Sequence, residues 1–142
     1  MSFLLDTNVV SEPTRPRPDV RVMEWFAAQP DETLFISALT LGELRRGILL
    51  LGDGKKRRAL LQWLETEIEP SFAGRILNID ALVTKAWAEL QCRATRGGRT
   101  LPTMHSFFAS TALAHDLTLV TRNVSDFAGA EVKLLDPWQA RL

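Results

Sequence analysis

The amino-acid sequence has 142 residues, a single cysteine, no net charge and no long apolar run. Because Cys92 has no second cysteine to pair with, an internal disulfide framework is excluded and a reducing compartment is expected. No stretch approaches the roughly 18 consecutive apolar residues of a membrane-spanning helix. The N-terminus also lacks the basic and then apolar pattern of a secretory signal. We therefore expect a cytoplasmic protein with no membrane partner.

Charge of one sign is not in excess, since 17 lysines and arginines balance 17 aspartates and glutamates. This balance argues against a protein that coats duplex nucleic acid, because such binders depend on many contacts from Lys and Arg to phosphates. The hydrophobic share of 46% and the charged share of 24% are ordinary for a globular protein and exclude disorder. We expect a single domain over residues 1–142, since no repeat or linker divides the chain.

Short apolar segments alternate with longer amphipathic ones. Strands are predicted near residues 1–5, 34–36, 76–79, 117–121 and 132–135. Helices are predicted over residues 20–28, 40–51, 55–68, 81–95 and 104–115. Alternation of this kind builds parallel βαβ units with right-handed connections. The sequence therefore predicts an α/β domain in which helices cover a central parallel sheet.

Polar side chains follow the predicted strands, at the edge where open parallel sheets bind ligands. The first strand is followed by Asp6, Thr7 and Asn8, the second by Ser37 and then Glu43, the third by Asp80, and the fourth by Arg122, Asn123 and Asp126. Carboxylates that converge repel one another unless a cation neutralises them. Their oxygens, and those of amides, suit Mg²⁺ or Mn²⁺ held together with water and phosphate. The pattern favours metal-assisted hydrolysis of phosphodiesters.

Each of these residues also has a structural interpretation. Asp6 and Asp80 are favoured caps for the helices that follow them. Residues 40–43 match a capping box, in which Glu43 would turn back onto a backbone amide. The polar residues after the fourth strand are typical of turns. Only their joint placement favours a functional site.

Three segments resemble a known family. Residues 4–12, which read LLDTNVVSE, and residues 36–47, which read ISALTLGELRRG, are similar to the opening of a PIN-domain ribonuclease. Residues 119–127, which read LVTRNVSDF, are similar to the closing motif of the same family, and the likeness continues to residues 136–138. Among PIN domains the chain is most similar to VapC and FitB-like toxins of bacterial toxin–antitoxin pairs.

The resemblance implies a three-layer α/β/α fold and a divalent-metal endoribonuclease that acts on RNA. It also implies a small DNA-binding antitoxin that blocks the active-site groove, and a toxin homodimer. Asp6 and Glu43 match metal-binding acids of the family, Asn123 matches its fourth acidic or amide group, and Asp126 is the acid just beyond. The remaining matched residues are expected to position phosphate or water; they are Thr7, Asn8 and Ser37.

One position departs from the family pattern. The family carries a third acid at the start of the penultimate helix, and this chain has His105 there. Neutral imidazole binds Mn²⁺, Zn²⁺ or Ni²⁺ but is a poor ligand for Mg²⁺, so we expect weak Mg²⁺ binding and low nuclease activity. Three interpretations stay open: a natural residue of a degenerate or Mn²⁺-preferring enzyme, an inactivating change, or a residue outside the metal site.

Basic and apolar side chains give further hypotheses about partners. Arg93, Arg96 and Arg99 are predicted to guide RNA phosphates towards the acidic pocket, with a solvated helix face as the usual alternative for basic runs. An apolar stripe is predicted to receive an antitoxin helix; it comprises Leu44, Ile48, Leu51, Leu60 and Leu64.

Other functions compete with the nuclease. The main alternative is a catalytically degenerate PIN domain that acts only by binding an antitoxin or RNA, and His105 is the feature that favours it. A phosphatase of the Asp-x-Asp kind is disfavoured because Asn8 cannot serve as the second acid. A dehydrogenase is disfavoured because no glycine-rich turn follows the first strand.

Overall fold

Five short strands form one parallel sheet in the computed structural model, which describes residues 1–139. The strands are β1 (Phe3–Leu5), β2 (Leu34–Ser37), β3 (Ile76–Leu77), β4 (Thr118–Val120) and β5 (Leu134–Leu135). Their order in the sheet is β3-β2-β1-β4-β5, and every pairing is parallel. The prediction of a parallel α/β sheet with five strands is therefore confirmed.

The helices follow the strands much as their periodicity predicts. They are α1 (Thr7–Ser11), α2 (Val20–Ala28), α3 (Ala38–Leu49), α4 (Lys55–Trp63), α5 (Glu69–Ser71), α6 (Ala81–Arg96) and α7 (Thr103–Ala114). Short 3-10 turns add η1 (Glu12–Thr14), η2 (Asp31–Thr33) and η4 (Val124–Phe127). The single helix expected over 55–68 is interrupted, because a π-helical turn, η3 (Leu64–Ile68), joins α4 to α5. Apolar spacing cannot distinguish such a turn from a continued α-helix.

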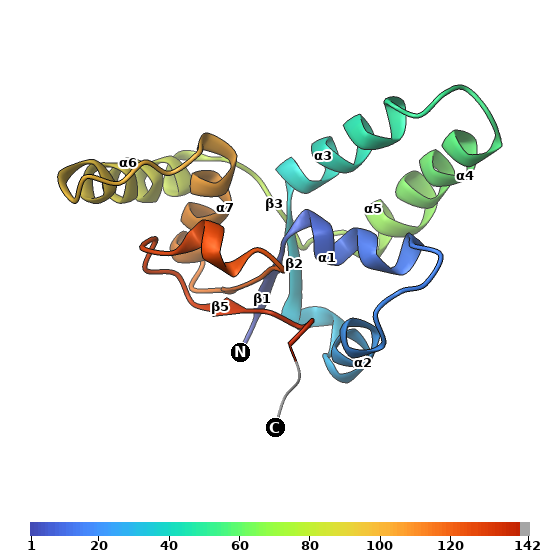
Figure 1. Ribbon diagram of the computed structural model, residues 1–142, viewed down its shortest axis with the longest axis horizontal. Coiled ribbons are helices and arrows are strands. Elements are labelled where there is room, and N and C mark those ends of the chain that lie inside the picture. Colours follow the sequence, from blue (N-terminus) through green and yellow to red (C-terminus); the bar gives the residue numbers. More distant parts are fainter. Residues whose placement is uncertain (140–142) are drawn as a thin grey trace.

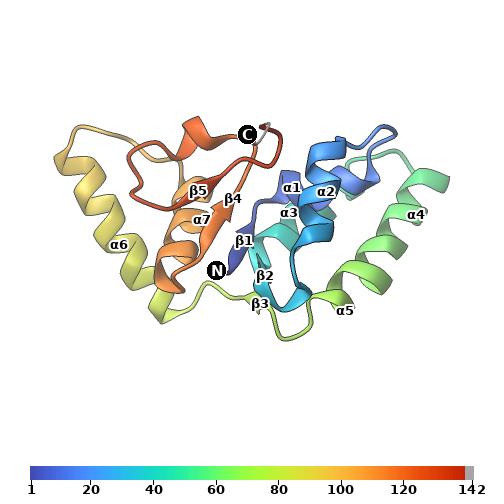
Figure 2. The same ribbon diagram turned by 90° about the horizontal axis from the view of Figure 1, so that it is seen from below.

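Side chains of β1 alternate between the two faces of the sheet and enter two separate cores. Phe3 and Leu5 pack with the side chains of α1 and α2, among them Val9 and Trp25. Leu4 packs on the opposite face with residues of α6 and α7. The helices α1 to α5 thus lie on one side of the sheet and α6 and α7 on the other, which confirms the three-layer α/β/α arrangement (Figures 1 and 2).

Strand order brings the candidate site together. Because β1 lies between β2 and β4, their carboxyl ends share one edge of the sheet, where α1 and α3 begin. In Figure 1 the α3–α4 pair extends to one side of this edge and the α6–α7 pair to the other. Within residues 1–139 no helix has the length and apolar character needed to cross a membrane.

Candidate active site

Asp6 occupies the carboxyl end of β1, with its carboxyl group buried at an exposed fraction of 9%. Its Oδ1 accepts a hydrogen bond from the backbone N–H of Thr7 at 2.8 Å, and its Oδ2 accepts one from the Thr121 hydroxyl at 2.7 Å. Burial raises the pKa of Asp6 above its ordinary value, and the hydrogen bonds from Thr121 and Thr7 only partly oppose this. The capping interpretation of Asp6 is also confirmed, because the same carboxylate caps α1.

Glu43 reaches the site from α3. The Thr7 hydroxyl lies 2.6 Å from Glu43 Oε1 and 3.2 Å from the Thr40 hydroxyl, so α1 and α3 are joined beside Asp6. The capping-box interpretation of Glu43 is wrong, because α3 begins at Ala38 and Ser37 is its N-cap. The Ser37 hydroxyl accepts from the backbone N–H of Leu39 at 3.0 Å, and the residue is fully buried. Its expected role in positioning phosphate or water stays a prediction.

The first turn of α7 brings His105 to the opposite side of the site. The imidazole ring lies 5.1 Å from the ring of Phe127, and its Nδ1 is buried with no hydrogen-bond partner among the residues described. His105 is near enough to Asp6 to act against the rise in the pKa of that carboxyl group, whereas Asp126 adds to the rise. Position 105 therefore lies close to Asp6, and its expected place among the metal ligands stays a prediction.

These side chains line one pocket of about 320 Å³. Its lining comprises Asp6, Thr7, Asn8, Ser11, Glu43, Met104, His105, Phe108 and Asn123. Residues that are 117 positions apart in the chain thus meet, at the ends of β1 and β4. Asp126 lies in η4 and does not line the pocket, although its charge acts on Asp6.

Sequence reasoning missed Thr121. Its buried hydroxyl donates to Asp6 Oδ2 and accepts from the backbone N–H of Asn123 at 3.0 Å, so it ties β1 to the turn after β4. The residue stands directly after a buried strand, which is the position that drew attention to Asp6. The predicted strand ran through residue 121, so Thr121 was counted as part of the strand, whereas β4 ends at Val120.

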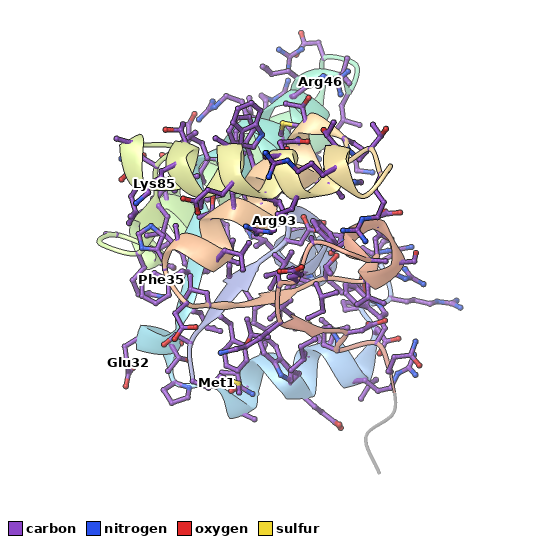
Figure 3. The ribbon with its side chains drawn as sticks, turned by 90° about the vertical axis from the view of Figure 1, so that its left-hand side faces the viewer. Met1, Glu32, Phe35, Arg46, Lys85 and Arg93 are labelled. Atoms are coloured by element: carbon purple, nitrogen blue, oxygen red, sulfur yellow. The ribbon has the colours of Figure 1, made fainter. Side chains whose placement is uncertain are left out.

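The three arginines of the predicted RNA path lie near the end of α6 and outside the pocket, where Figure 3 shows Arg93. Arg93 Nε lies 3.8 Å from a carboxylate oxygen of Glu131, and both side chains are substantially exposed. The Arg99 side chain packs over Gly129, where a Cβ atom would come within 3.0 Å of its guanidinium. These contacts fasten α6 to the loop after η4, and a role of Arg93, Arg96 and Arg99 in guiding RNA stays a prediction.

The donor set fits a hard divalent cation. Two carboxylates and the Asn123 amide provide oxygen ligands, and the buried Nδ1 of His105 is a further unsatisfied nitrogen in the same pocket. Within residues 1–139 no group of three or more His, Cys, Asp or Glu side chains is placed so that it could hold a metal ion, and the joint role of Asp6, Glu43 and His105 as metal ligands stays a prediction. Mg²⁺ commonly takes only one or two carboxylates and keeps several waters, so such a site suits it better than a closed cage would.

Comparison with known proteins agrees with this arrangement. The model of the PIN-domain family matches residues 3–131. The chain is 42% identical to toxin FitB from Neisseria gonorrhoeae, over 96% of this chain and 98% of that protein. It is 38% identical to VapC ribonuclease Y4jK from Sinorhizobium fredii, over 96% of this chain and 98% of that protein.

Solved structures give the same result. A structure of FitAB bound to a DNA fragment contains a chain that superposes with a TM-score of 0.93 at 38% identity. The superposition covers 99% of this chain and 98% of the other. Fold, pocket and sequence likeness therefore agree, and the chain belongs to the PIN-domain family.

Proposed function

We propose that this chain is the toxin of a toxin–antitoxin pair and an endoribonuclease that depends on Mg²⁺ or Mn²⁺. The observation that carries the proposal is the pocket in which Asp6, Glu43 and Asn123 meet at the carboxyl edge of the sheet. Relatives at about 40% identity over almost the whole chain are named as a toxin and as a ribonuclease, which supports both parts. A ribonuclease that cleaves cellular RNA would act in the cytoplasm, which is the location that we propose for this protein.

In the proposed mechanism Asp6 and Glu43 hold the metal, and His105 stands in the place of a third ligand. When bound, a divalent ion lowers the pKa of a water molecule and stabilises charge that develops on a phosphate oxygen. The hydroxyl groups of Thr7 and Thr121 hold the two carboxylates in place by the hydrogen bonds described above. The amide of Asn123, at the rim of the same pocket, is available to donate to a phosphate oxygen of RNA.

His105 determines how active this chain is. An imidazole removes one negative charge from the metal site, so we expect weak binding of Mg²⁺ and a relative preference for Mn²⁺. The alternative function, a degenerate PIN domain that binds its partner without cleaving RNA, rests on the same residue. A single comparison separates the two functions.

The experiment measures cleavage of RNA by the natural chain and by His105→Asp, each with Mg²⁺ and with Mn²⁺. We expect His105→Asp to cleave at least about tenfold faster with Mg²⁺ and to bind Mg²⁺ more tightly in a calorimetric titration. The double variant Asp6→Asn/His105→Asp is the control. If it is inactive where His105→Asp alone is active, the cleavage depends on this pocket and not on a contaminating nuclease. Equal rates for the natural chain and His105→Asp would show that position 105 does not limit the reaction.

The antitoxin is proposed to bind in a second hollow, of about 430 Å³, between α3 and α4. Its apolar part is formed by Leu44, Ile48, Leu51, Leu60 and Trp63. This hollow adjoins the metal pocket, because both are lined by Thr7, Ser11 and Glu43. An antitoxin segment bound in the hollow would therefore lie beside the metal pocket. Leu64, which was expected in the stripe, is fully buried and belongs to the core instead.

Replacement of an apolar residue in this hollow tests the antitoxin site. Leu60→Asp is expected to prevent copurification with the antitoxin encoded beside this chain, because a buried unpaired charge opposes docking. Leu82→Asp is the matched control, since Leu82 is 52% exposed on α6 and lies outside the hollow. If Leu60→Asp retains the antitoxin while its fold is intact, the proposed site is wrong.

We also propose that the chain forms a homodimer, as the family resemblance implies. Light scattering of the purified chain measures its mass in solution and tests this.

A further inference from the structure

Arg122, two residues after the end of β4, has an exposed side chain that lies over an aromatic ring. Its guanidinium carbon lies 5.3 Å from the centroid of the Trp138 ring, which is a cation–π contact. Trp138 is only 5% exposed, and its backbone N–H donates to Asp136 Oδ1 at 2.8 Å. The ring that supports the guanidinium is therefore itself fixed.

Its neighbours place Arg122 beside the metal pocket. Thr121 holds Asp6 on one side, and Asn123 lines the pocket on the other. The backbone N–H of Arg122 points to Asn8 Oδ1 at 3.5 Å, and the Asn8 amide nitrogen lies 3.5 Å from Asp6 Oδ2. The cation thus stands in the same turn that completes the site.

The guanidinium keeps its donors free. Within residues 1–139 Arg122 forms no ion pair and donates no side-chain hydrogen bond, whereas Arg45 contacts both Glu65 and Glu69. The contact with the Trp138 ring is not a hydrogen bond, so the N–H groups of the guanidinium stay available to donate to the oxygens of a phosphate. A carboxylate partner would have cancelled this charge.

Arg75 provides a comparison, since its guanidinium also lies over an aromatic ring but its N–H groups are used in structural hydrogen bonds. Its guanidinium lies 5.0 Å from the Phe72 ring centroid, but its N–H groups donate to the backbone carbonyls of Asp31 and Leu34 at 2.6 and 2.5 Å, and also to that of Ser71. These bonds fasten the segment before β2 to the start of β3. Arg122 also lies over an aromatic ring, but its guanidinium has no such acceptors among residues 1–139.

We propose that Arg122 binds a phosphate of single-stranded RNA adjacent to the phosphate that is cleaved in the metal pocket. The inference rests on the proposed function and adds a contact that positions the strand. The carboxylates of Asp6 and Glu43 repel RNA when no metal is present, so a cation in the turn beside the pocket supplies attraction that does not depend on the metal.

The test measures binding without catalysis. Short fluorescein-labelled single-stranded RNA of randomised sequence is titrated in EDTA, by fluorescence anisotropy, at several salt concentrations. We expect Arg122→Gln to weaken binding about fivefold. The slope of log Kd against log salt should fall by about 0.7, the value for one phosphate contact to a single strand. Arg122→Lys keeps the charge without the planar fork, so it should restore the slope and only part of the affinity.

Lys85→Gln is the matched control, because Lys85 is an exposed cation on α6 outside the metal pocket (Figure 3). The proposal about Arg122 is wrong if Lys85→Gln and Arg122→Gln weaken RNA binding equally, or if Arg122→Gln changes neither the affinity nor the slope. In either case the proposed function still stands, provided that the unchanged chain binds RNA. If the natural chain does not bind RNA at all, the proposed function fails as well. Thermal unfolding of each variant shows that losses do not reflect misfolding.

Discussion

At the scale of single residues, the buried carboxylate of Asp6 is placed for its proposed role in binding a metal, and it lowers the free energy of unfolding at neutral pH. Burial raises its pKa, so the folded protein holds this proton more tightly than the unfolded chain does. Below the ordinary pKa of 3.8 both states are protonated and Asp6 costs nothing. As pH rises from 3.8 through the raised pKa of the folded state, the free energy of unfolding falls, and it stays lower at neutral pH.

Asp6→Asn is therefore expected to raise the free energy of unfolding of the metal-free protein at neutral pH, while it abolishes cleavage. The gain should shrink in acid, where the natural carboxyl group is protonated. Urea unfolding at neutral and acidic pH measures both effects. Asp80→Asn is the control, since Asp80 is an exposed N-cap of α6 and asparagine caps equally well. A loss of stability in Asp6→Asn at neutral pH would contradict this account.

At the scale of elements, a buried acid shapes one wall of the hollow between α3 and α4, where the antitoxin is proposed to bind. Glu12 is only 3% exposed, and its Oε2 accepts from the backbone N–H of Asp19 at 3.0 Å. This bond closes the proline-rich segment between η1 and α2, and Arg15 and Pro16 of that segment line the hollow. Nothing in the sequence distinguishes Glu12 from an exposed acid, yet its side chain holds the loop between η1 and α2 in place.

Glu12→Ala should lower the free energy of unfolding by about 1–3 kcal/mol, because the N–H of Asp19 loses its acceptor. Glu12→Gln keeps an acceptor oxygen and should lose clearly less. Urea unfolding gives the stabilities, and antitoxin affinity should follow the same order, since the loop wall depends on this bond. Equal stability of Glu12→Ala and the natural chain would show that the bond contributes nothing.

At the scale of the whole molecule, the parallel sheet and the chemistry at its carboxyl edge could be predicted from the sequence, whereas the order of the strands and the partners of the side chains could not. Strand ends and family motifs led to Asp6, Glu43, His105 and Asn123, and all four line the same pocket. The predicted start of α3 was wrong by two residues, because Ser37 and Thr40 are both favoured caps in isolation, and in the structure it is the Ser37 hydroxyl that accepts from the backbone N–H of Leu39. Contacts between distant segments carry no local sequence pattern at all.

The same scale gives a prediction about folding. A chain that ends at Asp116 lacks β4 and β5, and β1 then loses its partner on one side. Both cores lose strand residues, Val120 from one and Leu119 from the other. We expect this shortened chain to show no cooperative unfolding transition and rapid proteolysis, because the buried surface that offsets chain entropy is lost. A cooperative transition in circular dichroism would contradict this expectation.

The position of β4 beside β1 has a consequence for protein synthesis. The strand that completes the centre of the sheet, and with it Thr121 and Asn123 of the pocket, emerges from the ribosome after more than four fifths of the chain. A nascent chain therefore has no assembled metal pocket until translation is nearly finished. For the ribonuclease proposed above, this topology means that the RNA being translated meets no complete active site on the growing chain.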